Sequence, residues 1–202
     1  MKTYVATSNG GKLHELQAIF AGSTLELATF PGYVAVPEGD SSYTENALRK
    51  ARGLQRQLRD AGIAAWVLAD DSGLEVAALG GRPGVLSARY AGEAASWAER
   101  RKHLLDELRG LPASERGARF VSHLSHLALV HADGSELVAA GVVDGSIATE
   151  ELGAGGFGYD PIFFYPPAGT TFAQMSEEAK NHCSHRRLAA GHLLGLLDMH
   201  AR

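Results

Sequence analysis

The adjacent carboxylates Asp70 and Asp71 carry the clearest chemical signal in the chain. They follow residues 65–69 (Ala-Trp-Val-Leu-Ala), an apolar run typical of a buried strand, and precede a Ser72-Gly73 turn. Successive strand residues point to opposite faces, but twist and a turn at the strand end can bring both carboxylates to one side. Without a basic neighbour in sequence they repel each other, and a divalent cation that prefers oxygen ligands, such as Mg²⁺, offsets that repulsion. The same residues are equally typical of a polar turn after a strand.

The segment Thr7-Ser8-Asn9-Gly10-Gly11-Lys12 lies between a predicted strand and a predicted helix. Backbone N–H groups, hydroxyls, an amide and a lysine at a helix N-terminus form a natural site for an anion. The segment is not a Walker A loop, because the glycine spacing before Lys12 differs, and it lacks the G-x-G-x-x-G pattern. An ordinary turn with a surface lysine explains the same residues.

Glu45 and Lys50 lie near the start of the second predicted helix. Ser42-Tyr43-Thr44-Glu45 fits a capping box with Glu45 at its third position. Glu45 also falls opposite the apolar stripe of this helix, which Lys50 flanks, so the Glu45 carboxylate could line a cleft instead. Capping and metal binding compete for the same oxygens, and both interpretations stay open.

A dense run of glycines and aromatic residues occupies positions 155–161, Gly-Gly-Phe-Gly-Tyr-Asp-Pro. Glycines let the backbone approach a ligand closely, and Phe157, which lies between glycines, can offer a stacking face to a base. The alternative is a loop with one packed aromatic side chain.

Residues 180–187, Lys-Asn-His-Cys-Ser-His-Arg-Arg, precede an apolar helix. Ser184 is a predicted N-cap, which places His185 and Arg186 in the first turn. Cations there oppose the helix dipole, so they are expected to contact an anion or a base edge; a solvated positive patch is the alternative. A zinc site in this segment is not favoured, because no second ligand pair follows at zinc-finger spacing.

Length and charge exclude several classes of protein. The 202 residues suit one domain, or one domain in two lobes. A net charge of −4 argues against broad nucleic-acid binding, because no basic field attracts phosphates. No signal peptide and no 18-residue apolar run is found, so no membrane association is expected. The single cysteine, Cys183, excludes an internal disulfide and fits a reducing compartment, so a cytoplasmic location is expected.

The alternation of strand and helix patterns predicts an α/β protein. His123 and His126 are expected on opposite faces of one strand. A hairpin is expected at Asp133-Gly134. Strands are predicted at residues 2–7, 25–28, 66–69, 120–130 and 137–143, and helices near 11–20, 43–60 and 97–109 and from 185 onward.

Together these clusters resemble the signature blocks of a known family, the inosine/xanthosine triphosphate pyrophosphatases, which remove non-canonical purine nucleotides. Eight blocks occur in the family's order over residues 7–186. They are Thr7-Ser8-Asn9-Gly10-Gly11-Lys12, Glu45-Asn46-Ala47, Lys50-Ala51, Asp70-Asp71-Ser72-Gly73-Leu74, Pro83-Gly84, Ser87-Ala88-Arg89-Tyr90, Phe157-Gly158-Tyr159-Asp160-Pro161 and Ser184-His185-Arg186.

The resemblance implies an elongated mixed β-sheet flanked by helices, with two lobes around a central active-site cleft. Residues 1–202 would form one pyrophosphatase domain, typically in a homodimer. The implied reaction is Mg²⁺-dependent hydrolysis of a nucleoside triphosphate such as ITP, dITP or XTP to the monophosphate and pyrophosphate.

The resemblance also implies a role for each matching residue. Mg²⁺ would be held by Glu45, Asp70 and Asp71, with Asp71 also acting as the base that activates water. Lys12, Lys50 and Lys180 would hold the phosphates, and further substrate contacts would come from Thr7, Ser8, Asn9, Gly10, Gly11 and Ser72. Phe157 would stack on the purine beside Gly158, Tyr159 and Asp160, and His185 and Arg186 would donate to its 6-oxo group.

Two departures from the family pattern are small: Ser8 stands where glycine is usual, and Tyr43 stands where phenylalanine is usual. Two other functions stay open. A pyrophosphatase for modified pyrimidine or methylated nucleotides would need a base pocket different from the one that Phe157 and His185-Arg186 indicate. A non-catalytic nucleotide- or RNA-binding module is disfavoured by the net charge and by carboxylates beside phosphates.

Overall fold

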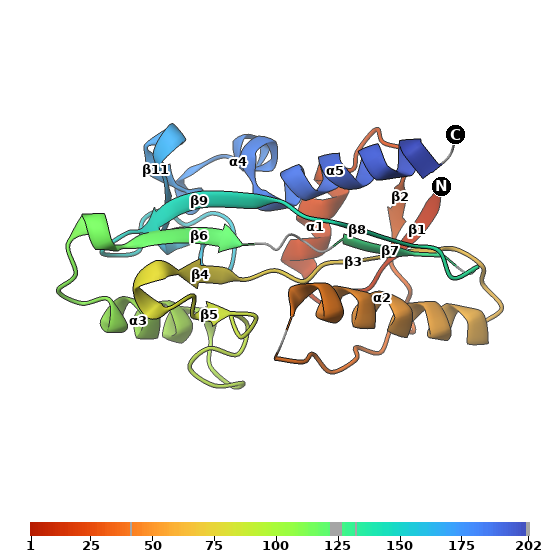
Figure 1. Cartoon of the computed structure of the whole chain (residues 1–202), viewed down its shortest axis with the longest axis horizontal. Coiled ribbons are helices and arrows are strands. Elements are labelled where there is room, and N and C mark those ends of the chain that lie inside the picture. The colour runs from red at the N-terminus through yellow and green to blue at the C-terminus, as the bar shows by residue number, and fades with distance from the viewer. Residues whose placement is uncertain (41, 122–126, 132, 201–202) are drawn as a thin grey trace.

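Two β-sheets lie end to end along the longest axis of the molecule, with helices on both sides (Figure 1). A computed structural model describes residues 1–40, 42–121, 127–131 and 133–200. The predicted α/β class and the elongated, helix-flanked form are confirmed, although the strands divide into two hydrogen-bonded sheets. None of the helices in these ranges is long and apolar enough to cross a membrane.

The first sheet is mixed, with the order β2-β1-β3-β7-β8. The first three of these strands run parallel, and β7 and β8 are added antiparallel. Parallel neighbours need long crossover connections, which helices α1 and α2 supply. The bounds are β1 (Lys2–Val5), α1 (Gly10–Ile19), β2 (Glu26–Ala28), α2 (Tyr43–Asp60), β3 (Trp66–Ala69), β7 (Leu127–Val130), β8 (Glu136–Ala139) and α5 (His185–His200).

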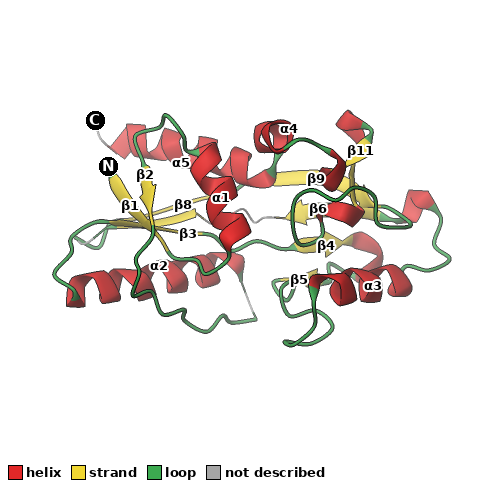
Figure 2. Ribbon diagram, turned by 180° about the vertical axis from the view of Figure 1, so that it is seen from behind, coloured by secondary structure: helices red, strands yellow, loops and turns green. Residues whose placement is uncertain are grey.

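Alternating side chains give this sheet two cores, one on each face. Val5 and Leu68 pack with α1 and α5, whereas Tyr4 and Val67 pack with α2. Figures 1 and 2 show α2 on one side of the sheet and α5 on the other. The predicted stripe of α2 is fully buried, as expected for an amphipathic helix on a sheet; it consists of Ala47, Ala51, Leu54 and Leu58.

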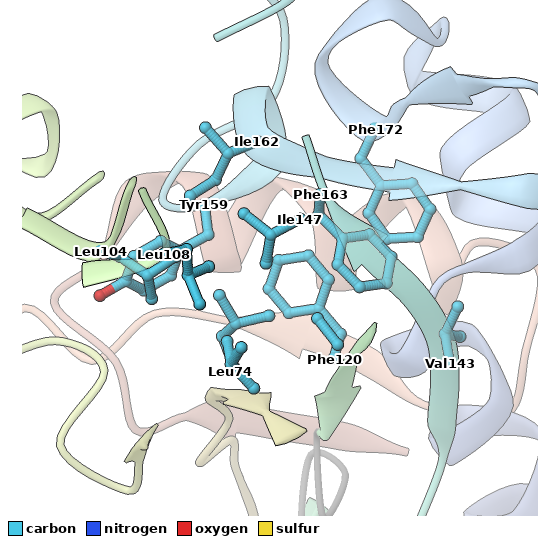
Figure 3. Close-up of a cluster of buried hydrophobic side chains, with 12 residues drawn as sticks. Leu74, Leu104, Leu108, Phe120, Val143, Ile147, Tyr159, Ile162, Phe163 and Phe172 are labelled. Carbon is cyan, nitrogen blue, oxygen red and sulfur yellow. The ribbon is translucent and has the colours of Figure 1, made fainter. Parts of the chain in front are cut away.

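The second sheet is antiparallel, with the order β11-β10-β9-β6-β4-β5. Its core is a cluster of aromatic and aliphatic side chains (Figure 3), in which the rings of Phe120 and Phe163 lie 4.3 Å apart. The bounds are β4 (Leu74–Val76), β5 (Pro83–Gly84), α3 (Trp97–Glu107), β6 (Gly117–Val121), β9 (Val142–Ile147), β10 (Phe163–Tyr165), β11 (Thr170–Thr171) and α4 (Glu177–Cys183).

The chain passes between the sheets at residues 70–73, which join β3 to β4, and at residues 140–141, which join β8 to β9. The prediction of one strand over 137–143 is therefore wrong. A Cβ at Gly141 would lie 2.5 Å from the carbonyl oxygen of His185, so this glycine lets the crossing pack directly on the backbone of α5. At residues 140–141 the chain leaves the first sheet, where β8 ends, and enters the second, where β9 begins.

Other predicted bounds agree more closely with the structure. The hairpin at Asp133-Gly134 joins β7 to β8, as expected. Helix α3 ends two residues earlier than predicted, and helix α4 was not predicted. The predicted strand 120–130 is described only at its two ends, in β6 and β7, and the expectation for His123 and His126 lies outside the described residues.

Candidate active site

A cavity of about 270 Å³ lies where the two sheets meet. Its walls come from both sheets and from the start of α5. Most of the predicted site residues line it, namely Thr7, Ser8, Asn9, Lys12, Lys50, Asp70, Ser72, Phe157, Gly158, Tyr159, Asp160, His185 and Arg186. Gly11 and Lys180 line an adjacent cavity of about 200 Å³, and Phe157 borders both cavities.

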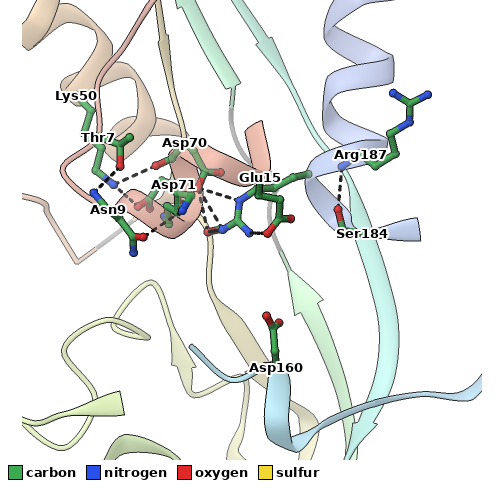
Figure 4. A network of polar contacts seen from close by, with 12 residues as sticks. Thr7, Asn9, Glu15, Lys50, Asp70, Asp71, Asp160, Ser184 and Arg187 are labelled. Atoms are coloured by element: carbon green, nitrogen blue, oxygen red, sulfur yellow. Dashed lines mark hydrogen bonds and ion pairs between the residues drawn. The ribbon is translucent and has the colours of Figure 1, made fainter. Parts of the chain in front are cut away.

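Asp70 and Asp71 occupy the crossing between β3 and β4 and are almost fully buried, at 2% and 4% exposure. Asp70 Oδ2 lies 2.9 Å from the Lys12 ammonium and 3.3 Å from Arg186 Nε (Figure 4). Asp71 Oδ1 lies 2.7 Å from the Lys50 ammonium. The carboxylates that lack basic neighbours in sequence thus receive them in space. Asp70 lines the cavity together with Lys12 and Lys50, whereas Asp71 and Gly10 line neither this cavity nor the adjacent one.

Burial acts against the charge on Asp71. It raises the pKa of Asp71, and the nearby ammonium groups of Lys50 and Lys12 oppose that rise. Asn46 Nδ2 donates to Asp71 Oδ2 at 3.2 Å and also donates to the carbonyl of Gly39 at 3.0 Å. The amide of Asn46 therefore joins the carboxylate to the segment before α2.

Glu38 is a site residue that sequence reasoning missed. Its carboxylate forms a close ion pair with Lys50, on the same ammonium that contacts Asp71. Although burial acts against ionisation, Lys50 lowers the pKa of Glu38. Residues 34–40 carry no periodic pattern, so no signal in the sequence placed this carboxylate at the site.

Glu45 lies outside the cavity. Its side chain is 48% exposed and sits 3.9 Å from Arg49, four residues further along α2. The Ser42 hydroxyl accepts a hydrogen bond from the Glu45 backbone N–H, which confirms the predicted N-cap. The structure therefore does not bring Glu45 to Asp70 and Asp71, and across the described ranges no three acidic, histidine or cysteine side chains gather as a metal-binding group.

The loop before α1 orients the first turn of the helix so that Lys12 lines the cavity. Asn9 caps the helix, because its Oδ1 accepts from the Lys12 backbone N–H at 3.1 Å, and Thr7 Oγ1 accepts from the Asn9 N–H at 3.1 Å. Gly10 is the first helical residue. A Cβ at Gly11 would lie 3.0 Å from the ring of Phe157, so glycine allows that ring to pack on the first turn of α1.

Phe157 forms an aromatic wall that two cations flank. The ring centroid lies 4.7 Å from the Lys180 ammonium and 5.2 Å from the Arg186 guanidinium. Asp160 Oδ2 accepts from the Phe157 N–H at 2.8 Å and contacts Lys180 at 2.7 Å. Tyr159 is buried behind this wall and donates to the carbonyl of Ser87 at 3.1 Å. The glycine-aromatic run is therefore held in place by polar contacts on both sides.

His185 and Arg186 begin α5, and Ser184 caps it as predicted by accepting from the Arg187 N–H. The His185 ring stacks on Phe120 at 5.2 Å, and its Nδ1 has no hydrogen-bond partner among the residues that the structure describes. Burial, with Arg186 beside it, holds the pKa of His185 well below its ordinary value, so the imidazole is neutral. The Arg186 guanidinium also donates to Ser72 Oγ at 2.8 Å, which joins this wall to the carboxylates.

The sequence of this chain is similar to a known protein family and to relatives of assigned function. The Ham1 family matches residues 3–196. The dITP/XTP pyrophosphatase of Geobacillus kaustophilus is 45% identical over 188 residues, covering 92% of this chain and 88% of that protein. A dITP/XTP pyrophosphatase of Thermus thermophilus is 46% identical over 197 residues, covering 96% of this chain and 90% of that protein.

Solved structures agree with these sequence relatives. A HAM1 protein from Coxiella burnetii has a TM-score of 0.82 and 36% identity, with coverage of 98% of this chain and 99% of the other. The Ham1 protein of Staphylococcus aureus has a TM-score of 0.81 and 35% identity, with coverage of 99% and 100%.

Proposed function

This chain belongs to the Ham1 family, and from that premise we propose that it hydrolyses non-canonical purine nucleoside triphosphates such as ITP, dITP and XTP to the monophosphate and pyrophosphate. One observation supports this most directly: Asp70 meets Lys12 at 2.9 Å in a cavity walled by Phe157, and Lys50 of the same cavity holds Asp71 at 2.7 Å. One bound nucleotide could then contact carboxylates that bind the metal and activate water, lysines that bind its phosphates, and a ring that stacks on its base.

The cations in and behind the cavity suit a triphosphate. We infer that Lys12 and Lys50 hold phosphate oxygens from the first sheet, and that Lys180 adds positive charge beside Phe157. As positive charges they stabilise the charge that develops on the departing pyrophosphate. Further hydrogen bonds to phosphate or sugar are assigned to the loop before α1 and to the crossing, namely to Thr7, Ser8, Asn9, Gly10, Gly11 and Ser72.

Oxygen donors of the kind that Mg²⁺ prefers lie at the crossing, although no three carboxylates of the described residues converge on one point. The Lys50 ammonium already gathers oxygens from Glu38, Asp71 and the Asp70 backbone, the last at 3.2 Å, so positive charge is stabilised at this point. We propose that Asp70 and Glu38 would hold Mg²⁺ and leave Asp71 to the attacking water, and we favour Glu38 over Glu45 because Glu45 faces Arg49 outside the cavity. When bound, the ion withdraws charge from the phosphate oxygens.

Asp71 is proposed as the base. Its raised pKa makes its carboxylate a better proton acceptor than an ordinary aspartate. It takes a proton from water, the water oxygen bonds to phosphorus, and the bond between the α and β phosphates breaks, with pyrophosphate leaving. Lys50 keeps Asp71 charged and oriented before the proton is transferred.

Base selection is assigned to the opposite wall. Phe157 would stack on the purine beside Gly158, Tyr159 and Asp160, while neutral His185 and charged Arg186 would donate to a 6-oxo group. The 6-amino group of adenine would leave those buried donors unpaired, which can reject an analogue by about 10⁴-fold.

We also propose that residues 1–202 act as one domain whose two lobes are the two sheets. From the resemblance we infer a homodimer in the cytoplasm that acts on free nucleotides and not on nucleic acid. Light scattering coupled to size exclusion would test the assembly, and a mass of one chain, 21.4 kDa, would contradict it.

The decisive experiment incubates the protein with ITP, XTP, GTP, ATP or dTTP, with Mg²⁺ or with EDTA, and identifies the products. Pyrophosphate from ITP and XTP, little from ATP, and none in EDTA are expected. Orthophosphate as the primary product would contradict cleavage between the α and β phosphates. Preference for dTTP would point to the pyrimidine alternative, and nucleotide binding without turnover would point to a binding module.

A further inference from the structure

We propose that Glu15 of α1 is a positioning residue that fixes Lys180 and Arg186 relative to each other, and thereby links phosphate binding to base recognition. The inference rests on the function proposed above. Glu15 lies in none of the motifs that carry the family resemblance, and it does not line the main cavity. Its position on α1, facing α4 and the start of α5, gives it this role.

One carboxylate oxygen bridges the two cations. Glu15 Oε2 lies 3.1 Å from the Lys180 ammonium and 3.3 Å from Arg186 Nη1 (Figure 4 shows Glu15 in this network). All three side chains are buried, and Glu15 is only 6% exposed. Two buried positive charges this close together repel each other, and the shared carboxylate offsets that repulsion.

The contact fixes the two cations against the same ring. Lys180 and Arg186 both lie over Phe157, at 4.7 and 5.2 Å from its centroid. Lys180 belongs to α4 and Arg186 to α5, so a side chain outside both helices sets the spacing of the two groups. Movement of either cation would change how the ring meets a base.

The other carboxylates around these cations face the substrate. Asp70 contacts Arg186, Asp160 contacts Lys180, and both line the main cavity, where a nucleotide and its metal would compete for them. Glu15 lines the adjacent cavity instead, which Phe157 also borders. It can therefore keep its hold on both cations while a nucleotide is bound.

Glu15 has the charge state that this role needs. Burial opposes its ionisation, but the charges of Arg186 and Lys180 lower the pKa of Glu15 to about 2. Its second oxygen, Oε1, has no hydrogen-bond partner within the described part of the chain. Both observations agree with a charged carboxylate that contacts the two cations through one oxygen, Oε2.

The test compares Glu15→Gln, which keeps the shape and removes the charge, with Glu15→Asp, which keeps the charge on a shorter side chain. Glu177→Gln is the matched control, because Glu177 borders the same adjacent cavity but is exposed and pairs with His14. For Glu15→Gln we expect KM for ITP to rise about tenfold or more, and the ratio of kcat/KM for ITP over ATP to fall by a similar factor. Glu15→Asp is expected to recover part of both, and Glu177→Gln to match the native chain.

A readout that needs no activity accompanies the kinetics. In ¹⁵N NMR spectra, the Lys180 ammonium and the Arg186 Nε–H are expected to give slowly exchanging signals in the native chain and to lose that protection in Glu15→Gln.

A native chain that fails to release pyrophosphate from ITP would refute the proposed function. The NMR comparison would still test whether Glu15 fixes the two cations. A folded Glu15→Gln variant with native signals, or one that loses ITP and ATP activity equally with unchanged KM, would overturn the inference. If Glu15→Gln does not fold, native kinetics and native signals in Glu15→Asp, whose shorter side chain withdraws the carboxylate from both cations, would overturn it as well.

Discussion

At the scale of single residues, two neighbouring aspartates receive different environments from their partners. Asp70 faces Lys12 and Arg186, whereas Asp71 faces Lys50 and Asn46. A carboxylate held by two cations is suited to stay charged beside a metal. A carboxylate whose pKa is raised by burial is suited to accept a proton. This difference in partners is the physical reason for dividing the roles between them.

Replacing Asp71 by asparagine tests that division. The variant Asp71→Asn keeps the size and the contact with Asn46 but cannot accept a proton, so kcat for ITP should fall by about 10² to 10⁴-fold. Nucleotide affinity should change much less, because Lys50 keeps its ion pair with Glu38. Pyrophosphate release measures kcat, and calorimetry with a non-hydrolysable analogue measures affinity. The exposed Asp198→Asn is the control, and near-native kcat in Asp71→Asn would remove it from the base role.

At the scale of secondary-structure elements, the chain segments that pass between the sheets build the site. The crossing from β3 to β4 carries both aspartates, and the crossing from β8 to β9 packs at Gly141 on the first turns of α5. Those turns carry His185 and Arg186. The position of the base-recognition residues therefore depends on a backbone contact that only glycine permits.

The variant Gly141→Ala tests this contact. Its Cβ would lie 2.5 Å from the His185 carbonyl oxygen and 2.6 Å from the Ala189 nitrogen, both of which are backbone atoms that cannot move independently. We expect a loss of about 1–3 kcal/mol in the free energy of unfolding, which thermal denaturation would detect.

The control for this variant lies in the helix that the crossing contacts. Gly191 has nothing within 4 Å of an added Cβ, so Gly191→Ala should be neutral or stabilise the chain by up to about 1 kcal/mol. Equal stability of Gly141→Ala and Gly191→Ala would show that the crossing tolerates a side chain, and the proposed role of this contact would be wrong.

At the scale of the whole molecule, the binding groups come from both sheets. Lys12 and Lys50 belong to helices that flank the first sheet, whereas Phe157 and Asp160 lie in the segment that leads into β10 of the second. A ligand in the cavity would therefore connect the two halves in addition to occupying a site. Ligands that bind only the folded chain stabilise it by about 2.7 kcal/mol at a concentration one hundred times their Kd.

This predicts a thermal shift with the reaction product. Mg²⁺ and pyrophosphate together should raise the unfolding temperature of the native chain by several degrees, and sodium sulfate at equal ionic strength should not. The variant Lys12→Met should lose most of the shift, because it removes a cation from the phosphate side. A shift of the same size with sulfate, or in Lys12→Met, would count against phosphate binding in this cavity.

The sequence by itself determined the α/β class, the bounds of α1 and α2, and the motif residues that line the cavity. These follow from local periodicity, caps and turn residues, which act within a few positions of each other. Only the tertiary structure decided that Glu38 and not Glu45 lies beside Lys50, that the run over 137–143 divides between two sheets, and that Glu15 holds two cations. These features rest on contacts between residues far apart in the chain, and their energies depend on burial and on charges that no local pattern records.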